Sequence, residues 1–273
     1  MMYEAATQPL GLGKIFIESL KLTKFGFKKV FLFVLIAVIV SAGLSSKIID
    51  DHNFFFNSLS LYQFHWMHIF RNFIIALVVC WCYVGIFVQY HSVLQQQKTG
   101  VKQTAIHAIK HFFPLFITMF LYFSMLSFGL VVFILPGIFI GVACTLAIAI
   151  VATETKNPIK ALKRSYQLVV PNWWRALVLP VAPFILLLLI GYLSNTFAKF
   201  LFIHGMNNLT MILSIRMIFS AVLGFFFTTW FFSLKVIVLH DFKLRAALKV
   251  QQADETITKS DDETVLNFLE QNT

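Results

Sequence analysis

The stretch that decides the fold runs from Leu135 to Trp174 and reads LPGIFIGVACTLAIAIVATETKNPIKALKRSYQLVVPNWW. It opens on a Pro-Gly pair, continues as an apolar run, and changes after Asn157 into a basic segment. Proline interrupts the backbone hydrogen-bond ladder and glycine permits a turn, so Pro136-Gly137 predicts a tight hairpin. Asn157 can cap a helix whose first residue is Pro158. The stretch therefore predicts a membrane-spanning helix followed by an amphipathic surface helix.

The composition of the whole chain extends this interpretation. Of 273 residues, 59% are apolar and only 12% are charged, against about 25% charged in soluble domains. A mean hydropathy of +0.80 excludes soluble enzymes, nucleic-acid-binding modules and disordered proteins. Six segments are apolar enough and long enough to cross a bilayer as helices: 28–46, 72–90, 112–133, 138–152, 175–193 and 211–239.

The predicted fold is all-α: a polytopic membrane helix bundle with six transmembrane helices, plus amphipathic interfacial helices on the cytoplasmic side. Residues 1–29 are expected to form a basic amphipathic N-terminal helix, residues 30–250 the six-span transmembrane domain, and residues 251–273 an acidic, flexible tail. Eighteen of the 22 Lys and Arg residues fall in the two termini and the loops after the second and fourth spans, and four fall in the other loops. By the positive-inside rule, both termini are cytoplasmic.

Basic residues are arranged on helical faces at the predicted inner side. Between residues 12 and 28, one arc holds Lys14, Lys21, Lys24 and Lys28, and the opposite arc is apolar (Leu12, Ile15, Phe16, Leu20 and Phe27). This pattern predicts a helix lying among anionic phospholipid headgroups; the alternative is a helix packed against other parts of the protein.

The helix expected after Asn157 repeats the pattern with Lys160, Lys163 and Arg164, and residues 101–112 form a weaker copy. Each basic helix is followed by an outward and an inward span, so the chain can be divided into three repeated units.

Catalytic and metal-binding patterns are not found in the sequence. The centres of the spans hold essentially no ionisable residue, and Gln89, Lys235 and Arg216 lie at span ends, where long side chains can snorkel. No phosphate-binding glycine loop, nucleophile elbow or zinc-protease motif occurs, so neither an enzyme nor a cofactor is predicted. His65 and His68, near an acidic pair, are either metal ligands or part of an interfacial aromatic belt.

Other titratable residues have structural interpretations. His107 and His111 lie four residues apart, and Cys80, Cys82 and Cys144 are expected to pack as small apolar residues. The net charge of +10 is attributed to a membrane surface rather than to nucleic acid. Glu154 is the one acid between Asp51 and Asp241, and we expect it to pair with Lys156 or Arg164.

About forty residues resemble the YciC-like family of bacterial inner-membrane proteins, which is related to the membrane domain of some glycerophosphodiester phosphodiesterases. The shared pattern is a Pro-Gly-Ile that opens the fourth span, an acid about seventeen residues later, an Ala-x-x-x-Ser helix and a following Leu and Asn; here it is met by Pro136, Gly137, Ile138, Glu154, Ala161, Ser165, Leu168 and Asn172. The chain departs from the pattern at Ile148, where a proline is usual, and in its acidic tail. The resemblance implies a helical protein of the bacterial inner membrane and no assigned activity.

The tail beyond residue 250 carries a net charge of −5, and it contains Val265, Leu266, Phe268 and Leu269. Such a segment is usually solvated, and its apolar residues give it a site for a protein partner or for the chain's own basic face. The leading functional hypothesis is a non-enzymatic protein that binds anionic lipid and supports or regulates membrane organisation. The alternative is a small transporter or lipid-translocating channel that uses a groove between the spans and the Pro136-Gly137 hairpin.

Overall fold

The computed structural model describes the backbone of residues 3–57, 66–97, 99–203 and 209–270, and the side chains of residues 3–41, 70–97, 99–203 and 211–253. Within these ranges the chain forms helices and no strand. The elements in chain order are α1 (Leu12–Asn57), α2 (Trp66–Leu94), α3 (Val101–Val132), α4 (Ile134–Ala143), α5 (Ala147–Thr153), α6 (Pro158–Val169), the short 3₁₀ helix η1 (Val170–Asn172), α7 (Trp173–Val178), α8 (Val181–Ile203) and α9 (Leu209–Glu270).

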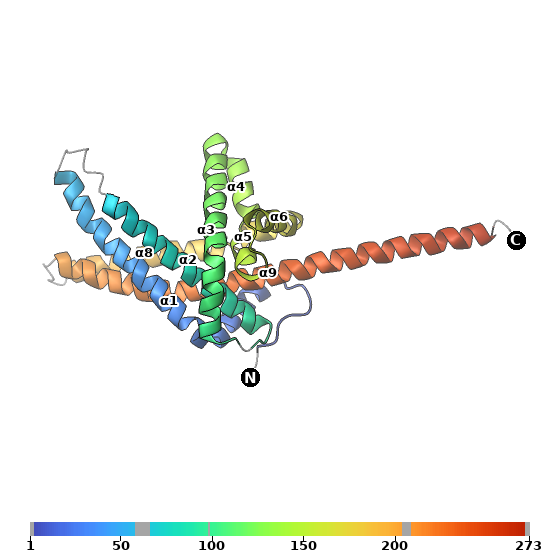
Figure 1. The fold of residues 1–273 in the computed structure, drawn as a ribbon, viewed down its shortest axis with the longest axis horizontal. Coiled ribbons are helices and arrows are strands. Elements are labelled where there is room, and N and C mark those ends of the chain that lie inside the picture. The colour runs from blue at the N-terminus through green and yellow to red at the C-terminus, as the bar shows by residue number, and fades with distance from the viewer. Residues whose placement is uncertain (1–2, 58–65, 98, 204–208, 271–273) are drawn as a thin grey trace.

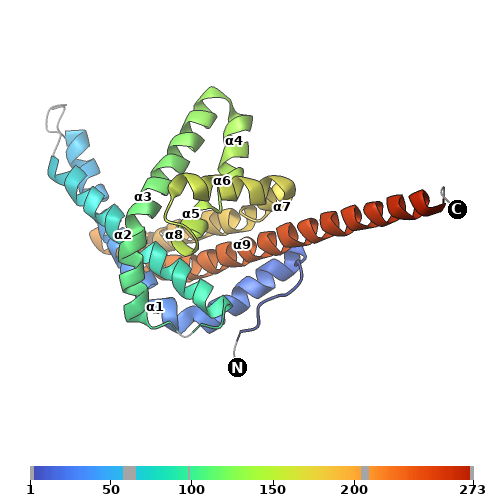
Figure 2. The ribbon, with the colours of Figure 1, turned by 45° about the vertical axis from the view of Figure 1, so that its right-hand side comes forward.

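The long helices pair as hairpins: α1 with α2, α3 with α4, and α8 with α9. Figure 1 shows these hairpins diverging from a common centre, where α1, α2 and α9 pack together. In both Figure 1 and Figure 2 the C-terminal part of α9 leaves the body of the molecule and projects away from it. The inner half of α9 is therefore the part to which the other elements attach.

Close approaches between α1 and α2 occur where glycine removes a side chain, and a hydrogen bond joins α2 to α9. A Cβ on Gly85 would lie 2.6 Å from the Phe33 ring, and one on Gly26 would lie 2.7 Å from the Tyr90 ring. Tyr90 is fully buried, and its hydroxyl donates to the Thr229 carbonyl at 2.9 Å. The three helices are thus held by aromatic rings seated on glycines and by a hydrogen bond that satisfies a buried phenol.

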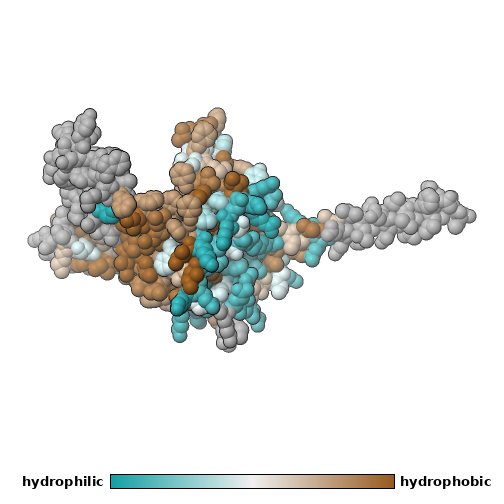
Figure 3. Space-filling model, viewed as in Figure 1, coloured by the Kyte–Doolittle hydropathy of each residue, from teal (hydrophilic) through white to brown (hydrophobic). Residues whose placement is uncertain are grey.

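Five segments of the described residues are long enough and apolar enough to span a membrane: Phe70–Leu94, Val101–Val132, Ile134–Thr153, Pro158–Ile203 and Met211–Ala253. Figure 3 shows a broad apolar surface on the left of the body and a hydrophilic band on its right. The predicted helical bundle is therefore confirmed, and its segments fit a multi-pass membrane protein. The first predicted span, 28–46, runs past residue 41, where the described side chains end.

The predicted domain boundaries do not coincide with breaks in the backbone. α1 continues through residues 29 and 30, and α9 continues past residue 250 to Glu270, so the backbone is helical across both boundaries. Neither boundary contains a proline or a glycine, and the residues around 250 are mostly good helix formers. The basic segment 101–112 is likewise the first part of α3, whereas the basic segment after Asn157 forms a separate helix, α6.

Two predicted spans are each divided in the structure. The fourth, 138–152, consists of α4 and α5 with a turn at residues 144–146. The fifth, 175–193, consists of α7 and α8, which are separated at Leu179 and Pro180. Proline has no N–H to continue the ladder, which accounts for the second division; the first depends on a contact from α6 that is described below.

Candidate functional site

The basic residues predicted to bind lipid, together with the neighbouring Arg164, form an exposed surface on α1 and α6. We call this the basic surface; it consists of Lys14, Lys21, Lys24, Lys28, Lys160, Lys163 and Arg164, all of them exposed. Lys21 pairs with Glu18 at 2.8 Å, and no other member has an ion pair with a described residue. Exposed apolar side chains lie among these cations, including Ile17 and Leu20 on α1 and Ile159 on α6. Cations interspersed with apolar groups suit the boundary between headgroups and acyl chains.

The opposite side of α1 packs against protein. Ile15, Ser19 and Leu22 are fully buried. Trp230 of α9 donates its indole N–H to the Ser19 hydroxyl at 3.0 Å, and the Ser233 hydroxyl donates to the Ser19 carbonyl at 2.9 Å. This side of α1 therefore fits the alternative prediction, a helix packed against other parts of the protein. Leu20 and the lysines of α1 face outward.

Glu154, at the end of α5, pairs with Lys243 of α9: its Oε1 lies 2.7 Å from the lysine Nζ. The predicted pairing with Lys156 or Arg164 is wrong. α5 ends against α9, and α6 carries Arg164 outward to an exposed position. Both partners are about one-quarter to one-third exposed, so the pair is only partly shielded from water.

Ser165 explains the division of the fourth span. Its fully buried hydroxyl donates to the Ala143 carbonyl at 2.8 Å and accepts from the Leu146 N–H at 3.2 Å. The Ala147 N–H bonds to Cys144 instead of to Ala143, so Ser165 supplies the partners that an unbroken helix would have supplied. The Ala-x-x-x-Ser motif thus holds α6 against the turn between α4 and α5.

The hairpin predicted at Pro136-Gly137 is present, with its turn slightly earlier in the chain. α3 ends and α4 begins around a single extended residue, Phe133. A Cβ on Gly137 would lie 2.5 Å from the Leu130 backbone nitrogen and 2.7 Å from the Gly129 carbonyl carbon. Only glycine allows this backbone contact, so Gly137 sets the spacing of the α3–α4 hairpin.

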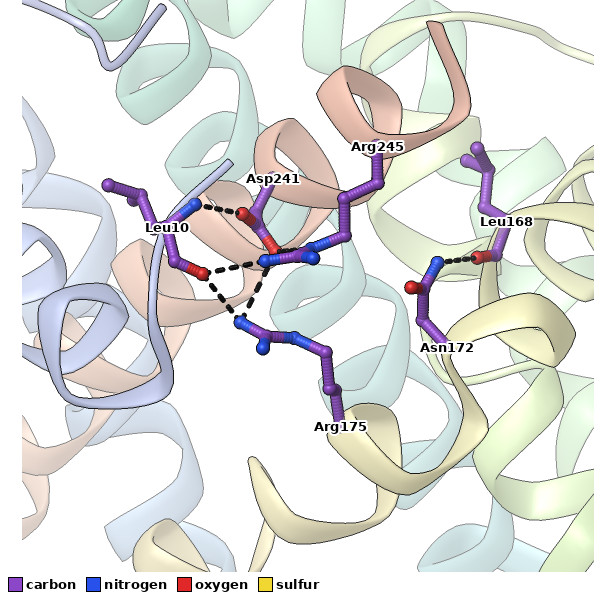
Figure 4. Close-up of polar contacts among 6 residues, drawn as sticks. All are labelled: Leu10, Leu168, Asn172, Arg175, Asp241 and Arg245. Atoms are coloured by element: carbon purple, nitrogen blue, oxygen red, sulfur yellow. Dashed lines mark hydrogen bonds and ion pairs between the residues drawn. The ribbon is translucent and has the colours of Figure 1, made fainter. Parts of the chain in front are cut away.

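Asn172 acts locally. Its side-chain amide donates to the Leu168 carbonyl at 3.4 Å, at the end of α6 (Figure 4). This contact stays within the α6–η1 segment, so the structure gives Asn172 a role in ending the helix rather than in a shared site.

A buried cluster around Asp241 was not predicted (Figure 4). The Asp241 carboxylate, which is 0% exposed, accepts from the Arg245 Nε at 2.9 Å and from the Leu10 N–H at 2.6 Å, and Arg175 of α7 lies 3.9 Å away. Both arginines also donate to the Leu10 carbonyl, at 2.6 and 2.7 Å. The cluster therefore ties α7, α9 and the N-terminal segment (residues 3–11) together.

Further contacts hold the same N-terminal segment. His240 contacts the Ala6 carbonyl at 2.8 Å, and Gln96 donates to the Tyr3 carbonyl at 3.2 Å. Tyr3 is buried, and its hydroxyl donates to Glu18 at 3.2 Å. Burial and the neighbouring Glu18 carboxylate raise the pKa of Tyr3 well above its usual value, so this phenol stays protonated.

Two of the three span-end residues that were expected to snorkel, Lys235 and Gln89, are packed inside the protein, while Arg216 donates to Asn195 at 3.0 Å in an exposed contact. The Lys235 ammonium donates to the Thr145 hydroxyl at 2.5 Å, in the turn between α4 and α5, and lies 5.4 Å from the centre of the Phe231 ring. Gln89 is fully buried and donates to the Thr104 hydroxyl at 2.7 Å. These polar side chains join helices to one another instead of reaching the membrane surface.

No group of three His, Cys, Asp or Glu residues within the described part of the chain is placed to hold a metal ion. His107 and His111 stack with ring centres 4.0 Å apart, while the predicted His65 and His68 site lies outside the residues whose side chains are described. Cys80, Cys82 and Cys144 are buried free thiols, as expected. Comparisons with protein-family models, curated proteins and solved structures found no match to this chain.

Proposed function

We propose that the chain is a non-enzymatic, multi-pass protein of the bacterial inner membrane, with six spans and both termini in the cytoplasm. In this proposal it binds anionic phospholipid through the basic surface and thereby supports or regulates the organisation of lipid or protein in the membrane. The resemblance to the YciC-like family and the distribution of Lys and Arg support this proposal.

The observation that carries the proposal is that most cations of the basic surface lack an acidic partner. Within the described residues, six of its seven cations have no acidic partner, and they lie beside exposed apolar side chains. Each basic residue near an anionic membrane contributes about 1 kcal/mol of attraction. An acidic phospholipid supplies both the missing negative charge and the apolar contact.

The test is lipid retention by the purified protein. We expect detergent-purified protein to retain phosphatidylglycerol in preference to phosphatidylcholine, and replacement of Lys14, Lys24 and Lys28 by Gln to weaken that preference. Lys199→Gln, in a predicted outer segment, is the matched control and should leave the preference unchanged. Equal retention of the two lipids by the unmodified protein would refute the proposal.

The predicted topology has its own test. In a background without the native cysteines, a single cysteine at Asn207 or Ser58, in predicted outer loops, should react in spheroplasts with an impermeant thiol reagent. A cysteine at Thr99, in a predicted inner loop, should react only after the membrane is opened. The reverse pattern would overturn the orientation.

The C-terminal part of α9 is proposed to bind a protein partner. It carries the acidic sequence beyond residue 250 and projects from the body in Figures 1 and 2. Its net charge of −5 favours a basic partner. Removal of residues 251–273 should abolish capture of that partner and leave lipid retention intact.

A transporter or lipid-translocating channel is the second candidate function. It is favoured by a pocket of about 220 Å³ between α1, α2 and α9, lined by small and hydroxyl-bearing residues such as Ser41, Tyr83 and Thr228. Polar groups at the depth of the spans are typical of substrate pathways. Lipid scrambling or solute flux in reconstituted vesicles, lost on Gly224→Phe, would favour this function over the first.

A further inference from the structure

An apolar groove lies between α4 and α7, outside the polar clusters described above. It has a volume of about 590 Å³ and is lined by Leu135, Pro136, Ile138, Phe139, Ile140 and Trp173. We call it the α4–α7 groove. Its volume falls in the range of roughly 300–1,000 Å³ that is usual for ligand pockets, and its walls are hydrocarbon and aromatic. The chemistry of the walls selects a hydrophobic chain.

One wall of the groove adjoins the basic surface on α6. The Phe139 ring stacks on Trp173, with centres 6.0 Å apart, and meets the edge of the Tyr166 ring of α6 at 6.4 Å. Figure 2 shows α6 lying across α4, with α7 continuing from its end. Lys163 precedes Tyr166 by three residues, so both lie on the same side of α6. Of the three cations on α6, Lys163 is therefore the one that shares the Tyr166 side of the helix.

The other wall is continuous with the surface of the α3–α4 hairpin. Leu135 is 80% exposed, and the preceding Val131 and Ile134 are also exposed. In a membrane-spanning hairpin such residues face lipid tails. A chain leaving the groove at this end therefore remains in an apolar environment, while the α6 end presents positive charge.

We propose that the α4–α7 groove binds one acyl chain of an anionic phospholipid, whose phosphate is held by Lys163. The inference rests on the proposed function, because it names the place where the protein holds the lipid. A phospholipid is the occupant that matches both ends, since it joins a hydrocarbon chain to a negative headgroup. Trp173 lines the groove at the level where tryptophan is enriched in membrane proteins, between headgroups and chains.

Tryptophan fluorescence tests the groove directly. Two variants would each retain one of the five tryptophans, Trp173 in the groove or Trp174 beside it, with the others changed to Phe. Each is reconstituted in phosphatidylcholine vesicles with increasing amounts of phosphatidylglycerol or phosphatidylcholine that carry brominated acyl chains, which quench a tryptophan in contact. Trp174 is 72% exposed and serves as the matched reporter of bulk lipid.

We compare the fraction of brominated lipid that gives half-maximal quenching of Trp173. This fraction should be about fivefold lower for phosphatidylglycerol than for phosphatidylcholine, as one added charge interaction predicts. Trp174 should respond equally to the two lipids. Lys163→Gln should remove the preference at Trp173, and Lys199→Gln, which removes a charge from α8 outside the basic surface, should retain it. Equal quenching curves at Trp173, or no quenching there, would overturn the proposal.

A second measurement does not depend on the tryptophan substitutions. Native mass spectrometry of Ile138→Trp, which fills the groove, should show the loss of one retained phosphatidylglycerol relative to Leu188→Trp, a change on the exposed side of α8. If Ile138→Trp retains as much phosphatidylglycerol as Leu188→Trp does, lipid binding in the groove is refuted, but the proposed function is not. Failure of the unmodified protein to retain phosphatidylglycerol would refute the proposed function itself.

Discussion

Asp241→Asn should strongly destabilise the protein, because the change removes one charge and keeps the shape. The carboxylate is fully buried and is contacted by Arg245, Arg175 and the Leu10 N–H. An amide in its place would leave the two guanidinium groups with the Leu10 carbonyl as a shared acceptor. Removal of one partner of a buried ion pair costs about 3–5 kcal/mol. Because the arginines are 24% and 22% exposed, water can hydrate them in part, and we expect about 3 kcal/mol.

The buried thiols provide the assay. A dye that becomes fluorescent on reaction with thiols reports thermal unfolding in detergent, since Cys80, Cys82 and Cys144 are free and buried. At about 2–4 °C per kcal/mol, Asp241→Asn should lower the melting temperature by about 6–12 °C. Asp241→Asn combined with Arg245→Gln should cost less than the sum of the two single changes. A shift below about 1 °C for Asp241→Asn, or strict additivity in the double variant, would refute the ion-pair account.

The same thermal assay checks three further changes. Gly137→Ala places a methyl group against backbone atoms of α3 and should lower the free energy of unfolding by about 1–3 kcal/mol. The control is Gly191→Ala, where the added Cβ meets open space and should cost no stability. Equal losses in the two variants would contradict the close-packed hairpin. Ser165→Ala leaves a buried carbonyl and N–H without their partner and should cost about 1–3 kcal/mol; an unchanged melting temperature would show that the turn closes without it. Glu154→Gln and Lys243→Gln should each cost only about 0.2–1 kcal/mol, because the pair is partly exposed, and the double change should recover part of the loss if the two side chains meet as the structure has them.

The helical membrane fold could be predicted because it depends on properties that are local in sequence. Long apolar segments require helices, and the Pro136-Gly137 pair and the Asn157 cap mark a turn and a helix start that the structure contains. The division of the fourth span could not be predicted in this way. Nothing in residues 144–146 forbids a continuous helix, and the turn is stabilised by Ser165, which comes from another helix.

The buried polar sites were missed for a related reason. Arg245 follows Asp241 by four residues, a spacing that predicts a helical ion pair, and this signal was available. Arg175 and Leu10 join the cluster from 66 or more positions away in the chain, and no periodicity connects them. Glu154 shows the same limit, since sequence proximity favoured Lys156 and Arg164 while the fold brings Lys243 to it.

Asp241 and Glu154 hold helices together, and neither pairs with a cation of the basic surface. Asp241 and Glu154 each engage cations on α9, and Lys235 of α9 reaches the turn between α4 and α5. Through these contacts α9 holds the N-terminal segment, α5 and the divided fourth span, and the same helix continues outward as the acidic extension. The helix that carries the acidic extension is therefore also the helix that positions α5 and, through the turn, α6. Asp241→Asn should therefore weaken both the fold and the lipid preference at Trp173, whereas Lys163→Gln should weaken the lipid preference alone.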